Sequence, residues 1–228
     1  AYDNVIHDVA ILDLPVVMCL DRGGLVGEDG VTHHGVFDMA AFGAVPGLTI
    51  AAPMNEPELR NMMYTALGSG HPFMIRYPRG HGEGLPWRGE KFETLPVGRG
   101  RRLREGADVA LLTVGTVGNA AARAAGRAAA EGVSVAHYDL RFVKPLDEAL
   151  LDEVGRKFRR VVTVEDGSLR GGVGEAVAAF FNGRGYDVRV QRLGIGDEWV
   201  EHGTPGQLYA LCGYDEEGIL RALLDTRA

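Results

Sequence analysis

Short apolar runs alternate with amphipathic segments along the first hundred residues, a pattern typical of α/β proteins. Apolar runs bounded by turn residues predict three strands, at residues 15–20, 48–52 and 73–77. Helical spacing of apolar residues predicts further helices at residues 1–14 and 37–42. The clearest helix start is Asn55, a capping residue followed by Pro57 in the first turn and by Glu58 three residues after the cap.

The alternation of strands and helices becomes more regular from residue 109 onward. Strands are predicted at residues 109–114, 133–140, 161–164 and 188–193. Helices are predicted at residues 118–131, 146–158, 173–181 and 219–224. Strands that alternate with helices in this way imply a mainly parallel sheet with right-handed crossovers.

Glycine, proline and charged residues dominate residues 80–100, which indicates a domain boundary. The fold class is therefore α/β, with two consecutive three-layer α/β domains and mainly parallel sheets. We predict domains at residues 1–93 and 101–228, with a linker at 94–100. Three strands are few for a sheet covered on both faces, so the first domain is expected to be incomplete. We expect the chain to be the C-terminal part of something longer.

Composition and charge narrow the classes of partner. The formal net charge is −7 and there is no basic cluster, which argues against a nucleic-acid partner. No apolar run approaches the length of a membrane span, and the N-terminus lacks a signal-peptide pattern, so no membrane partner is expected. Cys19 and Cys212 do not make a disulfide framework, and we expect both thiols to be buried in a reducing cytoplasm.

The strongest signal for a site is the segment from Asp21 to Asp38, with the sequence D-R-G-G-L-V-G-E-D-G-V-T-H-H-G-V-F-D. Its five glycines lose much backbone entropy on ordering, so contacts elsewhere must offset that loss. The segment also gathers ionisable side chains just beyond a predicted strand, where ligands bind in open α/β sheets. These residues are Arg22, Glu28, Asp29, His33 and His34.

His33 is the candidate for proton transfer. It lies in G-V-T-H-H-G, where the glycines let the backbone approach a ligand closely. A histidine there can act as a general acid or base near neutral pH, or donate a hydrogen bond to a developing oxyanion. Asp29 can orient or charge the ring, which favours a catalytic role over a loop histidine bonded only to backbone. We expect His34 to point elsewhere and to be structural.

Arg22 and Arg79 are the candidate anion-binding residues. Each follows a predicted strand, so in a parallel sheet both guanidinium groups project at the edge that carries the glycine segment. Two arginines converging on one edge suit a phosphate or a carboxylate. The alternative, a surface arginine paired with Asp or Glu, stays open for each. Arg76 leaves its strand on the other face and is expected to be structural.

Two further motifs carry weaker signals. Gly27 to Gly30, followed by Asn55, imitates the G-D-G…N pattern that holds Mg²⁺ and a diphosphate, but Asn55 fits better as a helix cap and Glu28 replaces the first Asp. We therefore assign no metal ligand and no cofactor-binding residue in this chain. Gly171 to Gly174 opens a helix whose amides could bind an anion, although close helix packing or a subunit contact is the favoured interpretation.

Several strings together resemble a known family. They are the glycine segment, I-A-A-P-M-N-E-P-E-L, I-R-Y-P-R-G, Y-D-L-R-F-V-K-P-L-D, V-V-T-V-E-D-G and G-G-V-G-E-A-V. Across essentially its whole length the chain resembles the C-terminal part of the 1-deoxy-D-xylulose-5-phosphate synthases, which are transketolase-like enzymes. The resemblance implies an incomplete first domain of the pyrimidine-binding type and a second domain of the transketolase C-terminal type.

The resemblance also implies an activity. Members of this family are cytoplasmic homodimers that join pyruvate, with loss of CO2, to D-glyceraldehyde 3-phosphate, and use thiamine diphosphate and Mg²⁺ as cofactors. The product feeds the non-mevalonate isoprenoid route and thiamine synthesis. At the matching positions, Arg22 and Arg79 would hold the phosphate of the aldehyde. His33 and Asp29 would sit beside the reacting carbons and assist proton transfers.

The same resemblance indicates which parts are missing from this chain. In the family, an N-terminal domain holds the diphosphate and Mg²⁺, and a glutamate earlier in the pyrimidine-binding domain activates the cofactor. Neither is recognisable in this sequence. We therefore expect the chain alone to be inactive and its partner to be the remaining N-terminal part of the same enzyme.

Two other functions remain as hypotheses. The chain could be the β subunit of a 2-oxo acid dehydrogenase, which passes an acyl group to a lipoyl carrier and has no need of paired phosphate-binding arginines. It could also be a non-catalytic α/β module whose glycine segment serves assembly only.

Overall fold

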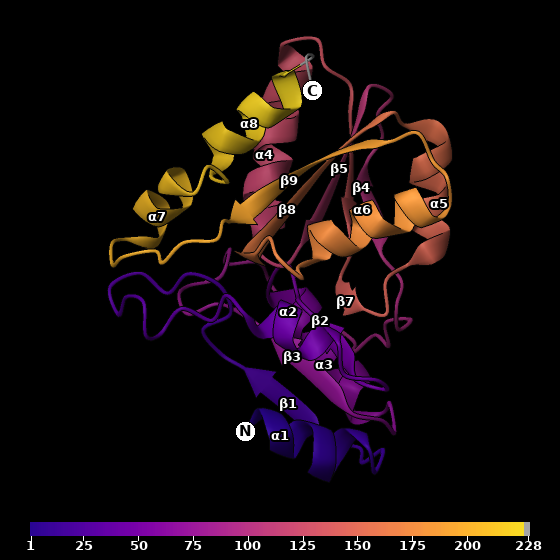
Figure 1. The fold of residues 1–228 in the computed structure, drawn as a ribbon, viewed down its shortest axis with the longest axis vertical. Coiled ribbons are helices and arrows are strands. Elements are labelled where there is room, and N and C mark those ends of the chain that lie inside the picture. The colour runs from indigo at the N-terminus through magenta and orange to yellow at the C-terminus, as the bar shows by residue number, and fades with distance from the viewer. Residues whose placement is uncertain (226–228) are drawn as a thin grey trace.

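Two sheets, each with helices on both faces, organise the computed structural model, which describes residues 1–225 (Figure 1). The helices are α1 (Tyr2–Asn4), the π-helical η1 (Val5–Ala10), α2 (Asp38–Gly43), α3 (Glu56–Leu67), α4 (Val117–Ala130), α5 (Glu148–Lys157), α6 (Val173–Gly183), α7 (Pro205–Leu211) and α8 (Glu216–Leu224). The strands are β1 (Val17–Leu20), β2 (Thr49–Ala51), β3 (Phe73–Arg76), β4 (Arg101–Arg104), β5 (Val109–Val114), β6 (Val135–Asp139), β7 (Phe142–Lys144), β8 (Arg160–Ser168) and β9 (Arg189–Ile195). The predicted α/β class is confirmed.

The first sheet is built around β3. All four residues of β3 are buried, and the strand pairs in parallel with β1 on one side and with β2 on the other. The fourth strand, β7, comes from much later in the chain and pairs antiparallel with β2. Figure 1 shows this strand descending from the upper half of the molecule to reach the lower sheet.

Helix α3 covers one face of this sheet and forms for the reasons that its sequence predicts. The side chain of Asn55 accepts a hydrogen bond from the amide of Glu58 (3.2 Å), and Pro57 occupies the first turn. Met62 and Ala66 are four residues apart, so they lie on the same face of the helix, and both are buried in the apolar cluster against β3. Residues of η1 and α2 pack in a second cluster on the opposite face.

The second sheet has a parallel core of β6, β5, β8 and β9, with β4 antiparallel at one edge. Every residue of β5 is buried, as expected of a parallel strand covered on both faces. Helices α4 and α8 cover one face, where Ala121, Ala124 and Ala128 pack in the same cluster as Ile219. Helices α5 and α6 cover the other face, so this unit has three layers (Figure 1).

Three elements lie outside the set that the sequence predicts. Strand β4 has the sequence Arg-Arg-Leu-Arg, and three of its four residues are exposed at the sheet edge, so it has no apolar pattern. Strand β7 has only three residues, too few for periodicity to show. Helix α7 does carry a start signal, because Thr204 and Gln207 form a capping box around Pro205.

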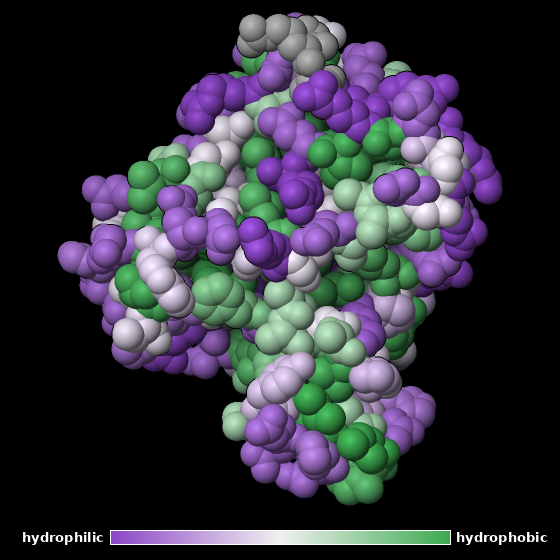
Figure 2. Space-filling model, viewed as in Figure 1, coloured by the Kyte–Doolittle hydropathy of each residue, from purple (hydrophilic) through white to green (hydrophobic). Residues whose placement is uncertain are grey.

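The expectation that both cysteine thiols are buried is wrong. Cys19 is exposed because β1 is an edge strand of the first sheet, and Cys212 is half-buried. Apolar side chains are also exposed in the segment that leads into β1, where Ile11 and Leu12 are 69% and 60% exposed. Figure 2 shows hydrophobic side chains at this lower end of the molecule. Within the described range, no helix has the length and apolar character needed to cross a membrane.

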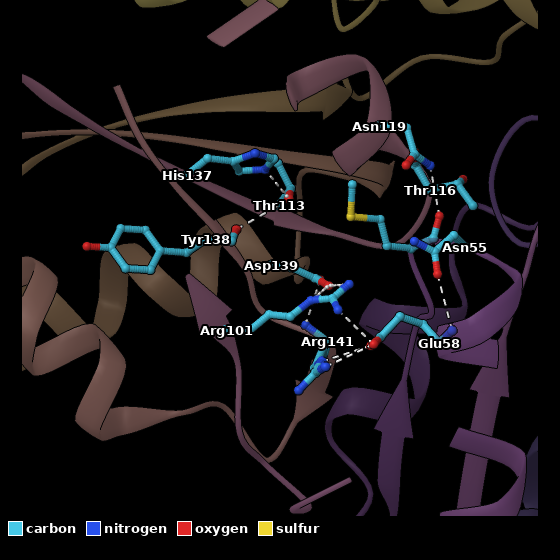
Figure 3. Close-up of polar contacts among 11 residues, drawn as sticks. Asn55, Glu58, Arg101, Thr113, Thr116, Asn119, His137, Tyr138, Asp139 and Arg141 are labelled. Carbon is cyan, nitrogen blue, oxygen red and sulfur yellow. Dashed lines mark hydrogen bonds and ion pairs between the residues drawn. The ribbon is translucent and has the colours of Figure 1, made fainter. Parts of the chain in front are cut away.

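We call residues 1–93 the first half of the chain and residues 101–228 the second half. A buried ion cluster joins these two halves (Figure 3). Glu58, in the first turn of α3, accepts hydrogen bonds from Arg101 (2.8 Å) and from two nitrogens of Arg141 (2.8 and 2.9 Å). Asp139 of β6 accepts a bond from Arg101 at 3.1 Å, and burial raises the pKa of Asp139 to about 6. Two carboxylates and two guanidinium groups thus satisfy one another and fix the start of α3 to the second sheet.

Replacing Glu58 tests this cluster. We expect Glu58→Gln to lower the free energy of unfolding by about 2–4 kcal/mol, because two guanidinium groups lose their shared carboxylate. Urea unfolding measures the change. The matched control is Glu153→Gln. Glu153 is an exposed partner of Arg102, which neighbours Arg101 on β4, so this change should cost less than about 0.5 kcal/mol. Equal losses in the two variants would contradict a stabilising role for the cluster.

Candidate functional site

A cleft of about 690 Å³ opens between the two halves of the structure. Its walls come from the segments that follow β2, β3 and β5, together with residues of α7 and the start of α8. Ligand sites typically occupy about 300–1,000 Å³. In open α/β sheets they lie beyond the carboxyl ends of the strands. Size and position therefore make this cleft the candidate functional site.

Each half of the chain contributes an arginine to the lining of the cleft, which also includes acidic side chains such as Glu216, the partner of Arg123. Arg79 lines it from the first half and Arg123 from α4. The side-chain amide of Asn119 donates to the backbone carbonyls of Met54 (2.8 Å) and Thr116 (3.0 Å). These bonds tie the start of α4 to the segment after β2, so the cleft wall there is continuous across the two halves (Figure 3).

The glycine segment forms a loop that is closed at its base. Gly24 and Gly35 exchange two backbone hydrogen bonds (2.8 and 2.9 Å), and the amide of Gly23 donates to the carbonyl of Tyr77. We call Gly23, Gly24, Leu25 and Gly35 the neck of the loop. Gly24 has a φ of +85°, and a Cβ on Gly35 would lie 2.1 Å from a backbone oxygen. Both positions therefore require glycine.

His34 anchors the loop to the second half of the chain. Its Nδ1 accepts a hydrogen bond from the amide of Val26 (3.1 Å), and its Nε2 lies 3.1 Å from the carbonyl oxygen of Val200. Both contacts are satisfied when Nε2 donates to the carbonyl of Val200. The prediction that His34 is structural is confirmed, because backbone groups use both of its nitrogens.

A buried charged group lies beneath the neck. Arg76 is 5% exposed and donates to the carboxylate of Asp38 (2.6 Å) and to the carbonyl oxygens of Gly35 (3.3 Å) and Asp166 (2.9 Å). Burial acts to lower the pKa of Arg76, but Asp38 and Asp166 reverse this effect and raise it. Arg76 is therefore a charged structural residue, as predicted, and it contacts both halves of the chain.

Arg79 and Asp29, two of the four candidate site residues, meet in an ion pair. Arg79 follows β3 and Asp29 lies in the loop, so the pair connects the loop to the cleft wall. The two side chains are 53% and 32% exposed. An anion that enters the cleft can therefore compete with Asp29 for the guanidinium group.

Arg22 and His33 are not among the residues that line the cleft. Arg22 pairs with the neighbouring Asp21, and its Nε is buried without a partner among the described residues. His33 is exposed, and its Nδ1 lies 3.0 Å from the hydroxyl of Thr32. The roles assigned to these residues from the sequence stay predictions.

The amides at residues 171–174 bind an anion from the same chain. Glu165 of β8 is 1% exposed and accepts hydrogen bonds from the amides of Val173 and Gly174, both at 2.8 Å. A Cβ on Gly174 would lie 2.5 Å from the hydroxyl oxygen of Thr163, so the close packing favoured by the sequence is confirmed. Burial outweighs the two amide bonds and raises the pKa of Glu165 to about 7.

Sequence reasoning missed Asp166 and the two tyrosines that contact it. The carboxylate of Asp166 accepts hydrogen bonds from the amide of Leu25 (3.0 Å) and from the hydroxyls of Tyr214 (2.7 Å) and Tyr209 (3.3 Å). Both tyrosines line the cleft. A signal was available, because Asp166 lies at the end of a predicted strand. The rule that ligands bind at such strand ends, which singled out the two arginines, applies to Asp166 as well.

A metal site is not evident among residues 1–225. No group of three or more His, Cys, Asp or Glu side chains in that range could hold a metal ion. Asn55, the last residue of the pattern that imitates a Mg²⁺ motif, is used as the cap of α3. The prediction that Asn55 serves as a helix cap is confirmed.

Comparison with known families identifies both halves. Residues 98–219 match the family described as "Transketolase, C-terminal domain", and residues 1–83 match "Transketolase, pyrimidine binding domain". A solved structure described as "Split gene transketolase, inactive beta4 tetramer" has a TM-score of 0.86 and 27% identity. The superposition covers 98% of this chain and 70% of that one.

Curated relatives carry a more specific name. The 1-deoxy-D-xylulose-5-phosphate synthase of Bacteroides fragilis is 58% identical over 229 residues, covering 100% of this chain and 35% of that protein. The synthases of Cytophaga hutchinsonii and Symbiobacterium thermophilum are 49% and 48% identical, covering 98% and 96% of this chain and 35% and 34% of their own lengths. The resemblance found in the sequence is confirmed, and the chain spans about a third of the length of these relatives.

The raised pKa of Glu165 predicts a dependence of stability on pH. Between its unfolded pKa of 4.5 and its folded pKa of about 7, the folded protein binds the proton more tightly. The contribution of Glu165 to stability is therefore complete below pH 4.5 and is lost as the pH rises through 7. We expect the unfolding free energy of the wild type, relative to Glu165→Gln, to fall over this window by on the order of 3 kcal/mol.

Urea unfolding at a series of pH values measures that difference. Glu175→Gln is the matched control, because it removes an exposed carboxylate from the first turn of the same helix, α6. A difference between wild type and Glu165→Gln that does not change with pH would contradict the raised pKa of Glu165.

Proposed function

This chain belongs to the transketolase family, and from that membership we propose that it is part of a 1-deoxy-D-xylulose-5-phosphate synthase. The whole enzyme would join pyruvate to D-glyceraldehyde 3-phosphate with release of CO2, on the route to isoprenoid precursors. The observation that carries this proposal is an identity of 48–58% to synthases of that name over 96–100% of the chain. The chain covers only about 35% of those proteins, so the remaining N-terminal part of the enzyme and a homodimeric assembly belong to the proposal.

Membership of the transketolase family implies thiamine diphosphate as the cofactor. The one pattern in the chain that imitates a diphosphate–Mg²⁺ motif does not fit that end of the cofactor, because the side chain of Asn55 is used as the cap of α3. We therefore place the Mg²⁺ ligands in the rest of the enzyme. This chain alone is then expected to be inactive, and its own contribution is to bind and orient the acceptor aldehyde.

In this proposal Arg79 binds the phosphate of D-glyceraldehyde 3-phosphate at the rim of the cleft. Its half-exposed guanidinium group is available to a ligand and is held in place by Asp29 in the absence of one. A phosphate dianion offers more charge and more acceptors than a carboxylate, so it competes well for the guanidinium group. Arg22, whose side chain is 41% exposed and pairs with Asp21, would be the second phosphate ligand, as the family resemblance implies.

Asp29 and His33 would serve proton transfer near the reacting carbons. When phosphate takes Arg79, Asp29 loses its partner and is free to contact the ring of His33, four residues along the same loop. A carboxylate beside an imidazole fixes the tautomer of the ring and stabilises its charged form.

Kinetics of the whole enzyme test these roles. We expect Arg79→Met to raise the KM for D-glyceraldehyde 3-phosphate at least about tenfold, because a charge-assisted bidentate contact is lost, and to leave the KM for pyruvate unchanged. Arg184→Met is the matched control, since Arg184 is also half-exposed and ion-paired but directly follows the last residue of α6 and does not line the cleft.

We expect His33→Ala to lower kcat at least about tenfold, through loss of proton transfer.

An unchanged KM for the aldehyde in Arg79→Met would contradict the phosphate role. That result would favour a 2-oxo acid dehydrogenase β subunit, whose acyl acceptor carries no phosphate. Full turnover in His33→Ala as well would favour a non-catalytic module whose glycine loop serves assembly.

A further inference from the structure

The group formed by Arg76, Asp38 and Asp166 has no assigned part in the proposed reaction, yet Arg76 and Asp166 are both buried next to the loop. Arg76 ends β3 of the first half, and Asp166 lies near the end of β8 of the second half; they are 5% and 4% exposed. Burying charge in this way is costly unless each group is paired and hydrogen-bonded. The contacts of Asp166 show what the arrangement holds in place.

Asp166 binds three separate parts of the chain with one side chain. Its Oδ1 accepts from the amide of Leu25 in the neck (3.0 Å) and from the hydroxyl of Tyr214 (2.7 Å). Its Oδ2 accepts from the hydroxyl of Tyr209 on α7 (3.3 Å), and its backbone oxygen accepts from Arg76 (2.9 Å). The carboxylate therefore links the neck of the loop to a cleft wall, because both tyrosines line the cleft.

The neck is shaped to receive this carboxylate. A Cβ on Gly24 would lie 1.9 Å from Oδ2 of Asp166, well inside van der Waals contact. Arg76 closes the other side of the neck by donating to the carbonyl of Gly35 (3.3 Å). Gly24 and Gly35 are the two residues whose paired backbone bonds close the loop, so the contacts act where the loop begins and ends.

We infer that Asp166 is a positioning residue for the acceptor aldehyde: through the neck it fixes the loop that carries Arg22, the proposed second phosphate ligand, directly before Gly23. A segment with five glycines has many accessible conformations, and charged hydrogen bonds at its base remove most of them. Asp166 is not among the residues that line the cleft, and in this inference it acts on the aldehyde through the loop. This inference rests on the proposed function, because it takes the loop to be part of the aldehyde site.

The experiment combines loop exchange with kinetics in the whole enzyme. Asp166→Ala removes every side-chain acceptor at this position. Asp166→Asn keeps an oxygen for the amide of Leu25, so its loop exchange and its KM for the aldehyde should stay close to those of the wild type. Gly24→Ala breaks the same contact from the loop side. Asp147→Ala is a matched control, since Asp147 is 6% exposed and caps α5 far from the loop.

Gly47→Ala is the control for backbone strain. Gly47 also has a positive φ (+73°), but a Cβ there would meet nothing within 4 Å. Comparing Gly24→Ala with Gly47→Ala therefore isolates the clash with Asp166 from the general penalty of a side chain at positive φ. If Asp166→Ala does not fold, this pair of variants decides the question by itself.

We expect hydrogen–deuterium exchange in residues 21–38 to be at least about tenfold faster in Asp166→Ala and Gly24→Ala than in the two controls. We expect the KM for D-glyceraldehyde 3-phosphate to rise at least about fivefold in the same two variants, with the KM for pyruvate unchanged. Loop exchange equal to that of the controls would overturn the inference, and so would a loosened loop with an unchanged aldehyde KM. Failure of the proposed function is seen separately, as an unchanged aldehyde KM in Arg79→Met.

Discussion

One guanidinium group, that of Arg76, bonds the carboxylate of Asp38 and the backbone oxygens of Gly35 and Asp166 at the boundary of the two sheets, and the geometry of the glycine loop depends on it. Its donors reach Asp38 at the start of α2, Gly35 in the neck and Asp166 in β8. A buried arginine whose bonds are satisfied by three separate elements holds them in a fixed relation, because losing any one would leave an unpaired polar group. The loop can therefore contain many glycines and still have a defined conformation.

The two halves are held together at a second place by the cluster of Glu58, Arg101, Asp139 and Arg141. That cluster begins in the first turn of α3, directly after Asn55, which lines the cleft. Strand β7 adds a backbone connection by pairing with β2. The charged cluster, the pairing of β7 with β2 and the contacts of Arg76 all cross the boundary between the two halves. Together they fix the positions of the cleft walls relative to each other.

The arrangement of strands and helices could be predicted from the sequence, because parallel strands covered on both faces are continuous apolar runs such as Val109–Val114. Strand β4 could not, since an exposed edge needs no apolar pattern. The rule that strand ends share a sheet edge found Arg79, and helical periodicity with a cap found α3.

The positions of Arg22 and His33 relative to the cleft could not be derived in that way. A strand end shows at which edge of the sheet a residue lies, but the conformation of the glycine loop decides how far its side chain is from the cleft. The part played by Asp166 depends on contacts across 141 residues of chain, which no local pattern encodes.

The most direct measurement of the central claim is a crystal structure of the whole enzyme with D-glyceraldehyde 3-phosphate bound. We expect phosphate oxygens at about 2.7–3.2 Å from the Arg79 guanidinium, with Asp29 released. A phosphate bound elsewhere, with Arg79 still paired to Asp29, would contradict it.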